Sequence, residues 1–398
     1  MKEISAIASN VQASTTVAVD ALYKKMKSEG IDVIGFGAGE PDFETPENIK
    51  EAAYKAIRSG QTKYTHSSGM PELRKAVADR LASDLGIIYT PEQIVVASGA
   101  KHSIYIALRA LINPGDEVIL PAPYWVTYAE AIKMVDGIPV IVDAPESSDF
   151  KITSSQLEAA VSEKTKLFIL NNPSNPTGML YDREELQSLA DVCVRHDLYI
   201  MSDEIYYKLV YDGKTFTSVA ELGEDIKERT VIINGVSKTY AMTGWRIGYS
   251  ASNKQLADVM GNYLSHSTSS PSTISQLAAV EAVSGSQDSI YVMRDAFEKR
   301  RNYIVERVNA IDGLNCRKPD GAFYIMINIE EQIGRTLGGK RIKNSDDFSL
   351  AFLESGLVAT VSCTGFGCDN FIRLTYAASM ESIKEGMDRL ERFVGANN

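Results

Sequence analysis

Apolar segments with strand character alternate with amphipathic, helix-like segments from about residue 45 to residue 285. This alternation predicts an α/β fold, in which a mostly parallel sheet carries helices on both faces. Helices are expected over residues 47–58, 71–84, 127–135 and 183–196, with another ending at residue 111. The seven expected strands cover residues 93–97, 116–120, 138–142, 166–170, 198–203, 230–234 and 246–250. Ligands of such sheets bind at the carboxyl ends of strands, so the residues that follow each strand are candidate site residues.

The pattern changes after about residue 287, where a long charged helix is expected over 289–312. A strand opening at Gly321-Ala322-Phe323-Tyr324 follows, with further elements at 347–355, 357–362, 371–376 and 380–394. Near the N-terminus, a helix is expected over 20–29 and a short strand over 31–36. We therefore predict a large domain over residues 45–285 and a smaller α+β domain built from residues 1–44 and 286–398.

The overall charge and the cysteine content exclude several functional classes. A net charge of −11 argues against nucleic acid or an anionic membrane as the main partner. No apolar run approaches the roughly 18 residues of a membrane span, and the first residues lack the apolar core of a signal peptide. Four cysteines in 398 residues do not make a disulfide framework, and Cys363 and Cys368 have no neighbouring cluster that would complete a metal site. We expect a cytoplasmic protein without a metal.

Lys238 lies just beyond one of the expected strands. The apolar run there ends at Asn234-Gly235, a strand-terminating signal, and Ser237, Lys238 and Arg246 follow. A lysine at a sheet edge can form an imine with an aldehyde, while a hydroxyl and a guanidinium beside it can bind a phosphate. Pyridoxal phosphate carries both groups. Most lysines are solvated surface charges, so this hypothesis depends on what the other strand ends supply.

Three other strand ends offer contacts for a phosphorylated ring. The turn at residues 98–101 joins small residues to a helix start, where backbone N–H groups can bind an anion, although many α/β turns look alike. Trp125 follows the strand at 116–120, and its indole can cover a flat ring or pack in the core. The segment 171–178 contains two prolines and a glycine, which predicts a rigid turn. This turn could present the Asn175 amide to an oxygen on the ring, or it could be an ordinary surface turn.

Two charged residues lie in apolar strands, where an unpaired charge is costly. Asp203 ends the strand at 198–203 and would pair with a protonated pyridine nitrogen, with Tyr206 near the ring hydroxyl. A helix N-cap is its alternative role. Arg373 lies inside the strand at 371–376, where its guanidinium could bind a carboxylate with two hydrogen bonds or form an internal salt bridge.

The glycines at 35, 37 and 39 do not form a dinucleotide-binding motif. Their spacing is G-x-G-x-G, and Pro41 and Pro46 interrupt the helix that should follow. We expect a loop whose backbone can approach a ligand, and not a nicotinamide oxidoreductase.

Five motifs, in order along nearly the whole chain, resemble those of the class I/II aminotransferases, which have the fold type I of pyridoxal-phosphate-dependent transferases. They are Asn-Pro-Ser-Asn-Pro-Thr-Gly at 172–178, Ser-Asp-Glu-Ile-Tyr at 202–206, Ser-Lys-Thr-Tyr at 237–240, Gly-Trp-Arg-Ile-Gly at 244–248 and Arg-Leu-Thr-Tyr at 373–376. Residues 38–43 and 123–126 further resemble the bacterial aspartate aminotransferase subgroup.

This resemblance implies a role for each candidate residue. Lys238 would bind the cofactor aldehyde covalently and later move a proton, and Asp203 would pair with the pyridine nitrogen. Tyr206 and Asn175 would bind the ring oxygen, and Trp125 and Ile205 would sandwich the ring. The residues implied for the phosphate are Ser237, Arg246, Gly99, Ala100, Lys101 and, from a partner subunit, Tyr64. The residues implied for the substrate α-carboxylate are Gly39, Trp125, Asn175 and Arg373.

The side chain of the substrate is less well defined. The animal and enteric enzymes bind a side-chain carboxylate with an arginine from the neighbouring subunit, and the corresponding residues here, 265–270, include no arginine. The bacterial subgroup uses a lysine in the phosphate-binding turn and a serine near the N-terminus, to which Lys101, Ser14 and Thr16 correspond. Lys101 could also be a solvated lysine at a helix start.

The resemblance therefore implies a homodimeric enzyme that transfers the amino group of L-aspartate to 2-oxoglutarate by a ping-pong mechanism. A prephenate, alanine, aromatic or broad-specificity aminotransferase and a β-lyase are alternatives on the same scaffold. A cofactor-sensing regulator is not expected, because such proteins carry a DNA-binding segment and residues 1–44 offer no room for one.

Overall fold

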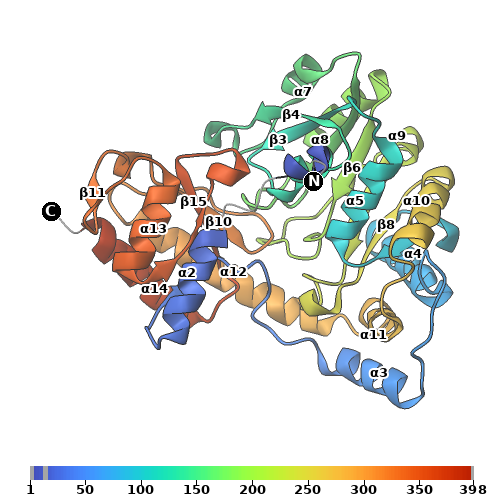
Figure 1. The fold of residues 1–398 in the computed structure, drawn as a ribbon, viewed down its shortest axis with the longest axis horizontal. Coiled ribbons are helices and arrows are strands. Elements are labelled where there is room, and N and C mark those ends of the chain that lie inside the picture. Colours follow the sequence, from blue (N-terminus) through green and yellow to red (C-terminus); the bar gives the residue numbers. More distant parts are fainter. Residues whose placement is uncertain (1–3, 12–16, 396–398) are drawn as a thin grey trace.

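The computed structural model describes residues 4–11 and 17–395 (Figure 1). Its largest sheet has seven strands in the order β2-β8-β7-β6-β5-β3-β4. Strand β8 runs antiparallel to β2 and β7, while the other neighbouring pairs are parallel. The bounds are Ile94–Ala97 (β2), Glu117–Ala122 (β3), Ile138–Asp143 (β4), Thr165–Asn171 (β5), Tyr199–Asp203 (β6), Thr230–Gly235 (β7) and Gly248–Ala251 (β8). The prediction of a mostly parallel seven-stranded sheet is confirmed.

Helices cover both faces of this sheet, because successive residues of its strands point to opposite sides. In β5, Leu167 and Ile169 pack in a buried cluster with α5, α6 and α10, while Phe168 and Leu170 pack in another with α7, α8 and α9. A third cluster holds α3, α4 and α11 against β2 and β8. The bounds are Glu47–Arg58 (α3), Pro71–Leu85 (α4), Ala100–Leu111 (α5), Thr127–Lys133 (α6), Ser154–Ala160 (α7), Arg183–Arg195 (α8), Glu224–Glu228 (α9), Lys254–Ser267 (α10) and Thr273–Ser284 (α11).

The ends of these helices follow local sequence signals. Pro71 occupies the first turn of α4, and Gly86 ends that helix in the left-handed region at φ 69°. Asp182 accepts a hydrogen bond from the Glu185 backbone N–H at the start of α8, and the Glu185 side chain bonds back to Asp182, which forms a capping box.

The C-terminal region has its own antiparallel sheet, in the order β14-β15-β10-β9. Its strands are Asn315–Cys316 (β9), Tyr324–Asn328 (β10), Val361–Ser362 (β14) and Phe371–Thr375 (β15). Its helices are Asp288–Asn309 (α12), Ser345–Gly356 (α13) and Met380–Gly395 (α14), and two short pieces, Thr336–Leu337 (β11) and Lys340–Arg341 (β12), pair with each other.

The N-terminal segment packs with this C-terminal region. Strand β1 (Ile34–Gly35) pairs in parallel with β13 (Val358–Ala359), and α2 (Val17–Ser28) lies beside α13 (Figure 1). A short helix, α1 (Ala6–Ser9), precedes them. The division into domains at residues 45 and 285 stays a prediction.

Two expected strands differ from the structure. The strand expected over 31–36 is reduced to Ile34–Gly35, and the one expected over 357–362 is two short strands. The second break arises because β13 pairs with β1 whereas β14 pairs with β15, so the backbone changes partner between Ala359 and Val361. Helices α1, α7, α9, α10 and α11 and the short strands β9, β11 and β12 were not predicted. None of the described helices combines the length and the apolar composition that crossing a bilayer requires.

Candidate active site

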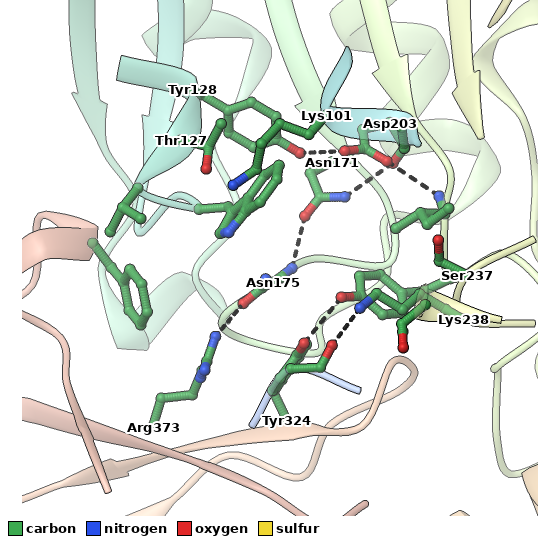
Figure 2. A pocket seen from close by; sticks show the side chains of 18 of the residues that line it. Lys101, Thr127, Tyr128, Asn171, Asn175, Asp203, Ser237, Lys238, Tyr324 and Arg373 are labelled. Atoms are coloured by element: carbon green, nitrogen blue, oxygen red, sulfur yellow. Dashed lines mark hydrogen bonds between the residues drawn. The ribbon is translucent and has the colours of Figure 1, made fainter. Parts of the chain in front are cut away.

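A cavity of about 430 Å³ lies where strands β5, β6 and β7 end. Its wall also includes residues of the C-terminal region, so it collects segments that are far apart in the sequence (Figure 2). The predicted site residues that line it are Gly39, Ala100, Lys101, Trp125, Asn175, Asp203, Ile205, Tyr206, Ser237, Lys238, Arg246 and Arg373.

Asp203 is the last residue of β6, and its side chain is 3% exposed. The Tyr128 hydroxyl donates a 2.6 Å hydrogen bond to Asp203 Oδ2, and the Ile205 backbone N–H donates to Oδ1 at 3.2 Å. Burial nevertheless raises the pKa of Asp203 to about 6, because these neutral donors only partly replace water. A buried carboxylate without a bonded cation, at the end of a strand, fits a site that pairs with a positively charged ring nitrogen.

Lys238 follows β7 and is half-buried. Its Nζ donates a hydrogen bond to the backbone carbonyl of Gly39. Burial lowers the pKa of Lys238 to about 8, which makes the neutral, nucleophilic amine available near neutral pH. This lysine is therefore not a solvated surface charge.

Arg373 lies within β15 and is 6% exposed. Its Nη1 donates to Asn175 Oδ1 at 3.0 Å and its Nη2 donates to the Gly37 carbonyl at 3.1 Å, so both partners are neutral oxygens. Its buried Nε has no hydrogen-bond partner among the described residues. A buried cation with an unsatisfied N–H at a cavity wall favours a bound carboxylate over the internal salt bridge that the sequence left open.

The turn between β2 and α5 lies against Arg246. Gly99 has φ 89°, and a Cβ at this position would collide with the Arg246 guanidinium. Arg246 Nη2 donates to the Ser98 carbonyl at 3.3 Å, and Nη1 donates to the Thr243 carbonyl at 2.8 Å. With the nearby Ser237 hydroxyl and the start of α5, this arrangement can bind a phosphate.

Lys101 and Trp125 are adjacent at the cavity wall. Lys101 Nζ lies 4.9 Å from the centroid of the Trp125 ring. Partial burial and then the charge of Arg246 lower the pKa of Lys101. Trp125 packs edge to face against Tyr128, with ring centroids 5.5 Å apart, and this contact fixes its orientation.

Some predicted residues lie elsewhere. Gly99 is not among the residues that line the cavity, although it lies against the Arg246 guanidinium. Tyr64 is 95% exposed, in a surface hollow formed with residues 270–274. Ser14 and Thr16 lie outside the described residues. Among the described residues, no group of three or more His, Cys, Asp or Glu side chains could hold a metal ion.

Several lining residues were not predicted from the sequence. Tyr128 bonds to Asp203, and the Asn171 side chain joins two loops by donating to the Asp203 carbonyl at 3.0 Å and accepting from the Asn175 N–H at 2.7 Å. Tyr324 accepts a hydrogen bond from the Tyr206 hydroxyl at 3.1 Å. Asn171 is the last residue of β5, so it could have been predicted in the same way as Asp203, as a polar residue at the carboxyl end of a strand. Tyr128 lies in helix α6, where the sequence pattern does not mark it as a site residue. The other lining residues that were not predicted are Val126, Thr127, Thr243 and Phe366.

Comparison with known proteins identifies the family. Residues 31–390 match the family model described as aminotransferase class I and II. The aspartate aminotransferase of Bacillus sp. (strain YM-2) is 46% identical over 381 residues, which cover 96% of each chain. The aspartate/prephenate aminotransferase of Cereibacter sphaeroides is 45% identical over 395 residues, which cover 99% of each chain. The crystal structure of the aspartate aminotransferase from Rhizobium meliloti superposes with a TM-score of 0.96 at 41% identity, over 99% of both chains. This chain therefore belongs to the class I and II aminotransferases.

Proposed function

We propose that this protein is a pyridoxal-5′-phosphate-dependent aminotransferase that moves the amino group of L-aspartate to 2-oxoglutarate, giving oxaloacetate and L-glutamate. One observation carries the proposal: a half-buried amine, a buried carboxylate and a buried guanidinium, from Lys238, Asp203 and Arg373, share one cavity without bonding to one another. Because each lacks an ion-pair partner within the cavity, the set is complementary to a ligand that carries an aldehyde, a cation and a carboxylate.

The described residues fit the cofactor. Asp203 and Lys238 would hold its ring nitrogen and aldehyde, and Asn175 and Tyr206 its ring oxygen. The phosphate would be bound by Gly99, Ala100, Lys101, Ser237 and Arg246. When bound, the cofactor supplies a protonated ring that accepts the electron pair released at the substrate Cα.

Lys238 would then act as the general base. Because burial lowers its pKa to about 8, a substantial fraction of this amine is neutral near physiological pH. Its Nζ would take the proton from the substrate Cα. It would then deliver this proton to the carbon atom that forms the aldehyde of the free cofactor. In the second half of the ping-pong cycle, the incoming 2-oxo acid would react by the same proton transfers in reverse order, again through Lys238.

Arg373 would fix the substrate by its α-carboxylate, with Gly39, Trp125 and Asn175. Two N–H groups of one planar guanidinium allow a single orientation of a carboxylate, which presents the Cα–H to Lys238. Trp125 and Ile205 would enclose the cofactor ring from its two faces.

Lys101 would bind the side-chain carboxylate of aspartate, with Ser14 and Thr16. In support, Lys101 is a cavity-lining cation whose neighbouring charge is the positive Arg246. A 45% identical relative named aspartate/prephenate aminotransferase supports prephenate as a second amino acceptor.

We further propose a cytoplasmic homodimer with shared active sites. An exposed Tyr64 would reach the partner's phosphate site, and the large and small domains of each chain would be residues 45–285 and 1–44 with 286–398. The described cysteines are free thiols, as expected for a reducing compartment.

The test is a panel of amino donors with 2-oxoglutarate, in which oxaloacetate release from aspartate is measured with malate dehydrogenase. Aspartate should give the highest kcat/KM of aspartate, alanine, phenylalanine and tyrosine. Prephenate tested as acceptor with aspartate checks the second activity. Glutamate formation from none of these donors would refute the proposal.

A further inference from the structure

Tyr324 has no role in the cycle proposed above, although it lines the cavity and is 1% exposed. It opens β10, and its hydroxyl accepts a 3.1 Å hydrogen bond from the Tyr206 hydroxyl. The two rings meet edge to face with centroids 5.8 Å apart. A buried hydroxyl without a partner is costly, so this pair keeps Tyr206 in a single orientation.

The ring of Tyr324 contacts a second residue of the site. The guanidinium carbon of Arg373 lies 4.4 Å from the Tyr324 ring centroid. Strands β10 and β15 are antiparallel, with Tyr324 opposite Thr375, so Tyr324 and Arg373 are diagonal neighbours on one face of the sheet. A cation over an aromatic face is attracted by the ring, and this attraction restricts the position of the guanidinium.

We propose that Tyr324 is a positioning residue that couples the two ends of the site. Its hydroxyl orients Tyr206 toward the cofactor ring oxygen, and its ring orients Arg373 toward the substrate carboxylate. This inference rests on the proposed function, because it assigns those ligands to Tyr206 and Arg373.

The hydroxyl of Tyr324 acts through hydrogen-bond cooperativity. When Tyr206 donates its proton to the ring oxygen, the Tyr324 hydroxyl can rotate and donate to the Tyr206 oxygen. Donation to the oxygen of a hydroxyl makes that hydroxyl a stronger donor, in a chain of two bonds. Tyr206 would then stabilise the negative charge on the ring oxygen more strongly than it could alone.

The surroundings leave room for this rotation. A Cβ at Gly39 would lie 3.0 Å from the Tyr324 hydroxyl, so a glycine at this position keeps the hydroxyl uncrowded. The charged groups that act on the pair are Arg373 and Asp203 at Tyr206, and Arg373 and Glu40 at Tyr324. Tyr324→Phe leaves all three charged side chains in place, because it keeps the ring that packs against Arg373 and removes only the hydroxyl.

The first variant is Tyr324→Phe, which removes only the hydroxyl. Its readout is the pH titration of the visible absorbance of the cofactor-loaded protein, which reports the proton shared by the lysine linkage and the ring oxygen. Without the Tyr324 hydroxyl, Tyr206 is a weaker hydrogen-bond donor and stabilises the negative charge on the ring oxygen less. The shared proton is then lost only at higher pH, so the titration midpoint should rise by roughly 0.2–0.7 pH unit. An unchanged or lowered midpoint would overturn the role of the hydroxyl.

The matched control is Tyr376→Phe. Tyr376 is also fully buried, and its hydroxyl bonds to the backbone carbonyls of Gly321 and Ala322 at 3.3 Å. This variant should lose a similar amount of thermal stability while the titration midpoint stays in place. A midpoint that moves equally in both variants would mean that loss of packing causes the shift.

A double-mutant cycle shows whether Tyr324 acts through Tyr206. In a Tyr206→Phe background, Tyr324→Phe should no longer move the midpoint, because the residue that transmits the effect is missing. A shift of the same size in both backgrounds would contradict the proposed coupling.

Tyr324→Leu tests the ring. Binding of the unreactive dicarboxylate maleate should weaken about 3- to 10-fold in Tyr324→Leu, which loses the cation–π contact, and by less than about 2-fold in Tyr324→Phe. Equal affinities in these two variants would refute the role of the ring. A wild-type protein that gains no visible absorbance with the cofactor would refute the proposed function itself, which is a separate outcome.

Discussion

Replacing Asp203 with asparagine should stabilise the cofactor-free protein near neutral pH, although it should abolish transamination. Asp203 is buried, and burial raises its pKa to about 6 from the ordinary value of 3.8. Its charged form is thus less favourable in the folded protein than in the unfolded chain. Asparagine has a similar shape, keeps an acceptor for the Tyr128 hydroxyl and carries no charge.

The magnitude follows from this pKa difference. Between pH 3.8 and about 6 the folded state binds the Asp203 proton more tightly than the unfolded state, so stability falls as pH rises through this window. A difference of about 2 pH units costs about 3 kcal/mol above pH 6. The amide leaves new N–H groups unsatisfied, which costs about 1–2 kcal/mol. Asp203→Asn should therefore gain about 1–2 kcal/mol at pH 7.5 and lose about 1–2 kcal/mol at pH 4.

The assay is urea unfolding of the cofactor-free variant and wild type at pH 4, 5, 6 and 7.5. Asp212→Asn is the control of opposite sign. Burial by itself would raise the pKa of Asp212, but hydrogen bonds from Arg301 and Lys318 lower this pKa to about 2. The Asp212 carboxylate stabilises the fold above pH 3.8, and this contribution is lost as pH falls through about 2, so its variant should be destabilised at pH 7.5. Destabilisation by Asp203→Asn that is equal at pH 4 and pH 7.5 would refute the reasoning.

Two further substitutions separate binding of the α-carboxylate from binding of the side chain. Arg373→Lys should lower kcat/KM roughly 10- to 100-fold for aspartate, alanine and phenylalanine alike, because every amino acid carries the α-carboxylate; a loss confined to aspartate in steady-state assays would contradict this role. Lys101→Ala should lower kcat/KM roughly 10- to 100-fold for aspartate and less than about 3-fold for alanine. Equal losses for both donors would mean that Lys101 serves the cofactor phosphate alone.

The residues at strand ends could be predicted from the sequence, because apolar runs locate the strands and a parallel sheet gathers their carboxyl ends. Asp203 and Lys238 were found in this way, and the cavity includes both. Arg373 was recognised because a charge inside an apolar strand requires a partner. The order of the strands depends on packing between distant segments, and no local pattern contains it.

The missed residues have ordinary local settings. Tyr128 reads as the apolar face of a helix, and only the tertiary fold brings its hydroxyl to Asp203. Tyr324 lies in a strand of another sheet, and its link to Tyr206 joins residues 118 positions apart. Tyrosine suits a hydrophobic core as well as a functional site, so the residue type alone does not reveal such contacts. The sequence therefore predicts the groups that carry charge better than the neutral groups that orient them.

The most direct test is to load the purified protein with pyridoxal 5′-phosphate, reduce it with borohydride and map the modified lysine by peptide mass spectrometry. A covalent bond between the aldehyde and Lys238 predicts a phosphopyridoxyl group on the peptide that contains Lys238 and the loss of this label in Lys238→Ala. An unlabelled protein, or a label on another lysine that persists in Lys238→Ala, would contradict the account.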